Sequence, residues 1–120
     1  MIKRDFLSLL DFSSDELKYV IERAKTLRKQ HENGEVYQPL VGKTGALILT
    51  MSSTRTRVAF EAGFAQMGAK VIFLSPGDTQ IGRGEPLEDL ARVLSEMVDI
   101  IMIRTASQQD IETLAHYATV

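Results

Sequence analysis

The sequence predicts an α/β fold: a parallel β-sheet in three layers, with helices on both faces and built from βαβ units. Three short apolar runs, at 46–49, 71–74 and 100–103, alternate with segments of helical periodicity. Buried strands that alternate with amphipathic helices are typical of such sheets. The chain has 120 residues, 44% hydrophobic and 25% charged, as expected for one globular domain. We therefore expect a single domain over 1–120 with the order α, β, α, β, α, β, α.

The first predicted helix begins after Ser13. The run Ser13-Ser14-Asp15-Glu16 has the form of a capping box, with Ser13 as N-cap and Glu16 at the third helical position. Gly34 is placed to end this helix, because glycine tolerates the left-handed backbone found at helix C-termini. Apolar residues follow helical spacing between these signals: Leu17, Val20, Ile21, Ala24 and Leu27.

The first predicted strand, Ala46 to Leu49, is continuously apolar, as strands buried on both faces are. A helix is predicted from about Thr56 to Met67, and Gly68 closes it. The second strand follows at Val71 to Leu74.

The next helix is predicted with Pro86 at its first position, where the missing N–H of proline costs nothing. Its core stripe is formed by Leu87, Leu90, Ala91, Leu94 and Met97. After the third strand, Ile100 to Ile103, Ser107 is expected to cap a last helix. The apolar residues of that helix are Ile111, Leu114, Ala115 and Ala118.

The end of the chain suggests a truncated domain. Thr119-Val120 follows the last helix where a fourth strand would begin. A parallel sheet of three strands with one uncovered edge leaves backbone groups unpaired. We therefore expect more protein beyond Val120.

Composition excludes several classes of function. The net charge of −2 gives no reason to expect nucleic acid or an acidic membrane surface as a partner. The absence of cysteine rules out disulfides and thiolate metal sites, and His31 and His116 have no ligand-like spacing. No apolar run approaches the ~20 residues of a membrane span. A cytoplasmic protein is the expectation.

Polar residues follow each predicted strand, at the edge where ligands bind in open α/β sheets. They are Ser53-Thr54-Arg55-Thr56-Arg57, the glycine-rich loop from Asp78 to Glu85, and Arg104-Thr105. Two arginines at a helix start are disfavoured by roughly 0.3–1 kcal/mol each, because that end of the helix is already positive. An anionic ligand on the free N–H groups, hydroxyls and guanidinium groups relieves the conflict. A dianionic phosphoryl group fits best.

Each of these features also has a plainer interpretation. Ser53 or Thr54 serves equally as a simple N-cap, and Arg57 has an ion-pair partner four residues on, in Glu61. Arg104, taken alone, is equally explained as a surface arginine at a strand end. The glycine-rich loop is either a flexible connection, or a lid or partner-reaching element. The caps explain neither Arg55 nor Arg57, and Arg55 has no such obvious partner, so anion binding remains the interpretation that accounts for both arginines.

At these residues the sequence resembles the carbamoyltransferase family, over essentially the whole chain. The string S-T-R-T-R-x-x-F-E is highly specific for that family, and Q-I-G-R-G-E favours its ornithine branch over the aspartate branch. The matching segments are Phe6 to Phe12, Ser53 to Glu61, Gln80 to Glu85 and Asp89 to Leu94.

The resemblance implies the carbamoyl phosphate-binding domain of the enzyme. The residues that would hold the phosphate are Ser53, Thr54, Arg55 and Thr56. Arg55 and Arg104 would polarise the carbamoyl carbonyl and stabilise the departing phosphate, and Gln80 would also contact the ligand, often at the site of a neighbouring subunit in a homotrimer. Arg57 and Glu85 are candidate supporting residues. The δ-amino group of ornithine would attack the carbamoyl carbon and yield citrulline and phosphate, as in arginine biosynthesis. The resemblance implies that no metal or organic cofactor is needed.

Two departures from the family are visible. Leu49-Thr50-Met51 stands where the family usually has Phe-Glu-Lys, so a charged pair is lost. The family's His-Pro-Thr-Gln segment and ornithine-binding domain would lie beyond Val120, so the chain alone is not expected to make citrulline. Three alternatives stay open: another amine acceptor (aspartate, putrescine or an acylated ornithine), a stand-alone phosphate-binding module without catalysis, and a folding fragment with an empty site.

Overall fold

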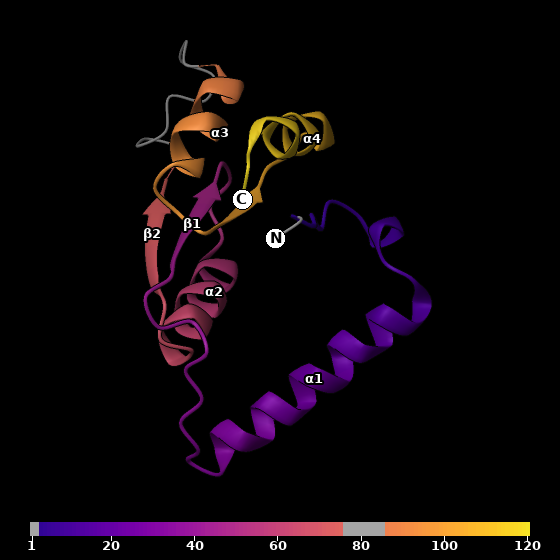
Figure 1. Cartoon of the computed structure of the whole chain (residues 1–120), viewed down its shortest axis with the longest axis vertical. Coiled ribbons are helices and arrows are strands. Elements are labelled where there is room, and N and C mark those ends of the chain that lie inside the picture. The colour runs from indigo at the N-terminus through magenta and orange to yellow at the C-terminus, as the bar shows by residue number, and fades with distance from the viewer. Residues whose placement is uncertain (1–2, 76–85) are drawn as a thin grey trace.

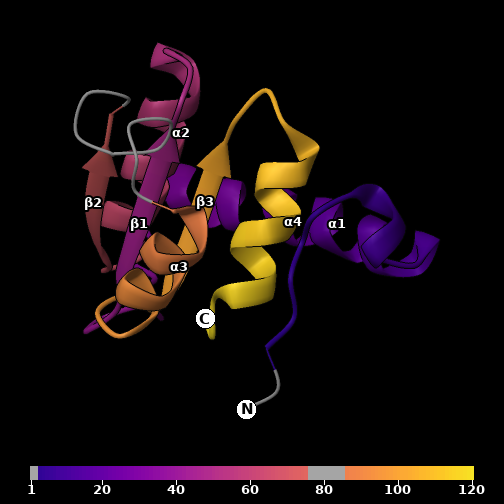
Figure 2. The ribbon, with the colours of Figure 1, turned by 90° about the horizontal axis from the view of Figure 1, so that it is seen from above.

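The computed structural model describes residues 3–75 and 86–120. Its sheet has three parallel strands in the order β2-β1-β3, formed by β1 (Thr44–Leu49), β2 (Lys70–Leu74) and β3 (Ile100–Arg104). Figure 1 shows β1 beside β2 with both arrows pointing the same way, and Figure 2 shows β1 between β2 and β3. The central strand is the most buried element: Ala46, Leu47 and Ile48 are fully inaccessible to solvent. The predicted parallel sheet and the burial of its first strand on both faces are confirmed, and the structure adds that this strand is the central one.

Helices cover both faces of the sheet, as Figure 2 shows from above. One face holds α2 (Thr54–Gln66); the other holds α3 (Leu87–Ser95) and α4 (Gln108–Tyr117), which pack against each other. The side chains of β1 alternate accordingly. Ala46 and Ile48 belong to the core cluster formed with α3 and α4, whereas Gly45 lies against Phe64 of α2.

The first helix stands apart from this sandwich. The long helix α1 (Ser14–Glu32) follows a short 3-10 helix, η1 (Leu9–Asp11), and Figure 1 shows it running away from the sheet. No residue of α1 is buried, and Tyr19 and Ile21 are more than half exposed. The amphipathic pattern predicted this helix correctly, but its apolar stripe is not covered within the described residues.

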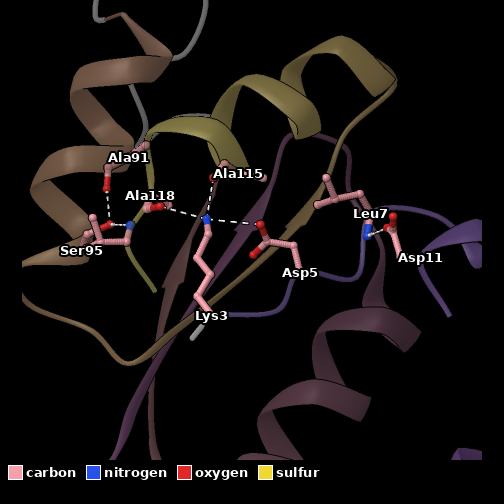
Figure 3. Close-up of polar contacts among 9 residues, drawn as sticks. Lys3, Asp5, Leu7, Asp11, Ala91, Ser95, Ala115 and Ala118 are labelled. Carbon is pink, nitrogen blue, oxygen red and sulfur yellow. Dashed lines mark hydrogen bonds and ion pairs between the residues drawn. The ribbon is translucent and has the colours of Figure 1, made fainter. Parts of the chain in front are cut away.

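The N-terminal segment returns to the sandwich through Lys3 (Figure 3). The Lys3 ammonium group donates hydrogen bonds to the carbonyls of Ala115 and Ala118, and it pairs with Asp5 at 3.1 Å. A cation at this end of α4 meets carbonyl groups that have no partner inside the helix. The segment before η1 is therefore tied to the last helix of the chain.

A serine side chain fixes the end of α4 to α3. The Ser95 hydroxyl donates to the Ala91 carbonyl at 2.7 Å and accepts from the Thr119 amide at 2.9 Å (Figure 3). The chain beyond α4 thus begins at a fixed position beside the sheet.

Several predicted boundaries need correction. Helix α2 begins at Thr54, two residues before the predicted start, and Pro86 is the N-cap of α3 rather than its first residue. Met97 lies beyond the end of α3 and is 66% exposed, so it is not part of the core stripe.

The predicted caps of the other helices are largely confirmed. Ser13 caps α1 and Ser107 caps α4, each accepting from the backbone N–H three residues on. Of the predicted capping box only this half forms, because the Glu16 carboxylate pairs with Arg4 instead. Gly34 and Gly68 both have positive φ at the helix ends, as predicted.

Candidate functional site

The candidate site lies at the carboxyl ends of β1 and β3. Leu49 and Arg104, the last residues of these strands, are register partners in the parallel ladder. The connection from β1 to α2, residues 50–53, therefore begins beside Arg104. This confirms that two of the three polar features predicted at the sheet edge lie together.

The N-terminus of α2 carries positive charge that no acidic residue of its first turn offsets. Ser53 is the N-cap, and its hydroxyl accepts from the Thr56 amide at 3.4 Å. The amides of Thr54 and Arg55, in the same first turn, have no carbonyl inside the helix to bond. The first turn contains no acidic residue, unlike those of α1, α3 and α4. The positive end of this helix is thus left without a compensating carboxylate.

Three of the predicted site residues form one hydrogen-bond network. The Ser53 hydroxyl donates to Thr56 Oγ1 at 2.8 Å, and Arg104 Nη1 donates to the same oxygen at 3.0 Å. Because Thr56 Oγ1 accepts both bonds, its own hydrogen remains available to an anion. The network joins β3 to the start of α2 in the free protein, which is the preorganisation that charge stabilisation requires.

The two arginines of the motif have different surroundings. Arg55 is exposed, and within the described ranges it forms no hydrogen bond or ion pair with another residue. Arg57 bonds Glu61 through Nε at 2.7 Å, and its guanidinium carbon lies 3.7 Å from the ring centroid of Phe73 in β2. Arg57 thus forms the ion pair with Glu61 that their i,i+4 spacing suggested. It also joins α2 to β2 through its contact with Phe73. Arg55 is the arginine free to meet a ligand.

The remaining predicted residues lie outside the described part of the chain. Gln80 and Glu85 both fall in 76–85, as does the glycine-rich loop. Among the residues that are described, no group of three or more metal-ligating side chains is found. Likewise, no described helix has the length and hydropathy to span a bilayer.

The sequence did not predict that Thr50 belongs to the site. Thr50, the first residue after β1, donates to the Arg104 carbonyl from its amide at 2.9 Å and from its hydroxyl at 3.1 Å. In the sequence Thr50 is visible only as a departure from the family's usual glutamate. A hydroxyl directly after a strand was the available signal, but its partner lies 54 residues away along the chain.

The chain is similar to known carbamoyltransferases in sequence and in structure. Residues 4–120 match the family described as aspartate/ornithine carbamoyltransferase, carbamoyl-P binding domain. The chain is 58% identical, over all of its 120 residues, to an ornithine carbamoyltransferase from Psychrobacter arcticus, of which it covers 39%. It thus spans about two fifths of the length of that relative.

Solved structures give the same result. The ornithine carbamoyltransferase of Pyrococcus furiosus is similar with a TM-score of 0.94 and 44% identity, over 98% of this chain and 37% of that chain. The catalytic subunit of aspartate transcarbamoylase from M. jannaschii is similar with a TM-score of 0.87 and 27% identity, over 98% of this chain and 39% of that chain.

Proposed function

The chain belongs to the aspartate/ornithine carbamoyltransferase family, and we propose that it binds carbamoyl phosphate as one domain of an ornithine carbamoyltransferase. The observation that best supports this is the network from Ser53 through Thr56 to Arg104, at a helix N-terminus that lacks acidic residues. Such a site suits a dianionic phosphoryl group, which accepts hydrogen bonds from N–H, hydroxyl and guanidinium donors together.

Each residue of the motif has a distinct role in this proposal. Ser53, Thr54, Arg55 and Thr56 hold the phosphate through amides at the start of α2 and through the hydroxyls of Thr54 and Thr56, while the Ser53 hydroxyl keeps its bond to Thr56. Arg55 and Arg104 add positive charge, polarise the carbamoyl carbonyl and stabilise the phosphate as it leaves. Gln80 contacts carbamoyl phosphate at the site of a neighbouring subunit, in a homotrimer.

The reaction follows from this arrangement. The neutral δ-amino group of ornithine attacks the carbamoyl carbon, a tetrahedral intermediate forms, and its collapse expels phosphate and leaves citrulline. Fixed donors positioned around the developing charge supply the rate enhancement, with little covalent work for the protein. We place this activity in cytoplasmic arginine biosynthesis.

Ornithine is favoured over aspartate as the acceptor by the pattern of similarity. The identity is 58% to the Psychrobacter relative and 44% to the Pyrococcus structure, both ornithine enzymes, but 27% to the aspartate enzyme of M. jannaschii. The acceptor is bound mainly by a second domain, which we place beyond Val120.

The free edge of the sheet supports the proposal that the domain continues. Strand β3 is an edge strand, and beside it lies a groove of about 560 Å³ lined by apolar side chains that include Phe60, Phe64, Met102 and Val120. Helix α4 shares a face with α3, so a right-handed crossover after α4 would add the next strand on this edge. We propose that a fourth strand following Val120 fills the groove.

A binding titration tests the proposed function directly. Carbamoyl phosphate is titrated into the 120-residue chain by calorimetry, beside an Arg55→Ala variant and an Arg28→Ala control. Arg28 lies on α1, where it is exposed and paired with Glu32. We expect binding by the parent and by the control, and weaker binding by Arg55→Ala. A parent that does not bind contradicts the proposal for this chain.

An activity assay tests the need for the second domain. The chain is incubated with carbamoyl phosphate and ornithine, and citrulline is measured against a full-length ornithine carbamoyltransferase as positive control. We expect no detectable citrulline from the 120-residue chain. Clear formation of citrulline would mean that residues 1–120 are sufficient for catalysis and that a second domain is not needed to bind ornithine.

A further inference from the structure

Arg104 is held at its main chain by the connection between β1 and α2, and at its side chain by the first turn of α2. At the backbone, its carbonyl accepts from the amide and the hydroxyl of Thr50 at 2.9 and 3.1 Å. At the side chain, its Nη1 donates to Thr56 Oγ1 at 3.0 Å. Thr50 therefore holds the main chain of Arg104, and Thr56 holds its side chain.

The two bonds from Thr50 differ in what they require. The amide bond extends the β1–β3 ladder by one residue beyond Leu49, and any residue except proline can make it. The hydroxyl bond needs a side-chain donor of the right length, which only serine and threonine supply here. A glutamate, the family's usual residue at this position, is an acceptor when ionised and cannot bond a carbonyl oxygen.

We propose that Thr50 is a positioning residue for Arg104, its hydroxyl fixing the main chain from which the guanidinium reaches the anion site. A second donor on the carbonyl restricts rotation of the Arg104 backbone at the end of an edge strand. The cost of ordering the long arginine side chain on a ligand falls when its backbone is already fixed. The inference rests on the proposed function, since it assigns Arg104 to phosphate.

Substitution at Thr50 separates the hydroxyl from the rest of the side chain. Thr50→Val keeps the shape and the branched Cβ but removes the donor, while Thr50→Ser keeps the donor. Thr26→Val on α1 is the matched control, because the Thr26 hydroxyl also donates to a main-chain carbonyl at 3.1 Å, far from the site. Any general effect of losing such a bond appears in both valine variants.

Calorimetry with carbamoyl phosphate, and with inorganic phosphate as the simpler probe, measures the effect. We expect Thr50→Val to weaken binding about three- to tenfold, the range expected for one neutral hydrogen bond. Thr50→Ser and Thr26→Val are expected to bind like the parent. Equal affinities for Thr50→Val and Thr26→Val would overturn the inference.

A double-mutant cycle tests whether Thr50 acts through Arg104. If it does, Thr50→Val has no further effect on binding in an Arg104→Ala background. If the losses of binding free energy from the two substitutions are additive, Thr50 does not act through Arg104 and has only a general structural role. The melting temperature is recorded for each variant, so that a loss of folding is not mistaken for a loss of binding.

An NMR measurement tests whether Thr50 positions Arg104 without any ligand. If the parent chain does not bind carbamoyl phosphate, that result contradicts the proposed function, and the NMR result still decides the role of Thr50. The ¹⁵N heteronuclear NOE of Arg104 Nε reports how well its guanidinium is ordered in the free protein. We expect this NOE to fall in Thr50→Val and to stay at the parent value in Thr50→Ser and Thr26→Val. An unchanged NOE in Thr50→Val would show that the hydroxyl does not position Arg104.

Discussion

Arg104 and Thr56 are joined by a 3.0 Å hydrogen bond from Nη1 to Oγ1, although they lie 48 residues apart in the chain. The bond spans from the end of β3 to the first turn of α2. It turns two separate sequence features into one site, whose groups can be tested one at a time by substitution.

Arg104→Ala is expected to weaken binding of carbamoyl phosphate by roughly 1.5–3 kcal/mol, the range for a lost hydrogen bond to a charged group. The Arg104 side chain is exposed, so the free energy of unfolding should change little. Calorimetry measures the affinity and urea denaturation the stability, with Arg28→Ala as control. Unchanged affinity would exclude Arg104 from the ligand site.

Arg55 and Arg57 should respond in opposite ways when replaced by alanine. Arg55→Ala removes a cation from a helix N-terminus, so the free protein should gain about 0.3–1 kcal/mol of stability while losing ligand affinity. That combination identifies a residue retained for binding rather than folding. A loss of stability with unchanged affinity would reverse our assignment of the two arginines.

Arg57→Ala should instead lower stability by about 0.5–1.5 kcal/mol, because it loses the Glu61 ion pair and the contact with Phe73. Its affinity for carbamoyl phosphate should stay within about twofold of the parent, less than one hydrogen bond is worth. Urea denaturation and calorimetry on the same preparation separate the two effects. A large loss of affinity for carbamoyl phosphate would show that Arg57 is part of the binding site.

Gly45→Ala and Gly63→Ala form a matched pair for the packing of α2. An added Cβ at Gly45 would lie 2.7 Å from Phe64 Cζ, whereas at Gly63 it would meet no atom within 4 Å. Gly45→Ala should therefore destabilise the fold by about 1–3 kcal/mol through overpacking. Gly63→Ala, inside the helix, should stabilise it by about 0.5–1 kcal/mol. Urea midpoints of the two variants measure this contrast.

Asp11 should make part of the stability depend on acid pH. Hydrogen bonds from the Leu7 and Ser8 amides, at 2.7 and 2.9 Å, lower the pKa of its carboxyl below the usual value, with a further contribution from Arg4. The stabilising effect is complete above the unfolded pKa and is lost as pH falls through the lower folded pKa.

NMR titration of Asp11 should therefore give a pKa below 3.8. Asp11→Asn should remove this part of the acid dependence of unfolding, while the Asp15→Asn control, on the exposed start of α1, should keep it. A normal pKa for Asp11 would contradict the assignment of these hydrogen bonds.

Much of the fold is readable in short stretches of the sequence. The apolar run 46–49 predicted a strand buried on both faces, and Ser13, Ser107 and Gly68 mark helix ends through bonds or backbone angles within a few residues. Patterns of this kind depend on local periodicity and backbone sterics, which a single sequence expresses directly. The conflict of cations at the start of α2 is equally local, and for that reason the residue order alone indicated an anion site there.

The sequence by itself therefore determined the order of the elements and the burial of the first strand, and it indicated a candidate anion site at Ser53 to Arg57. The spacing of Arg57 and Glu61 already suggested their ion pair, but only the tertiary structure showed that Arg57 also packs on Phe73 of another strand, whereas Arg55 has no partner among the described residues. The tertiary structure also decided that Thr50 and Thr56 both hold Arg104. These contacts depend on strand register and side-chain direction, which are set by packing between segments some 50 residues apart rather than by any local pattern.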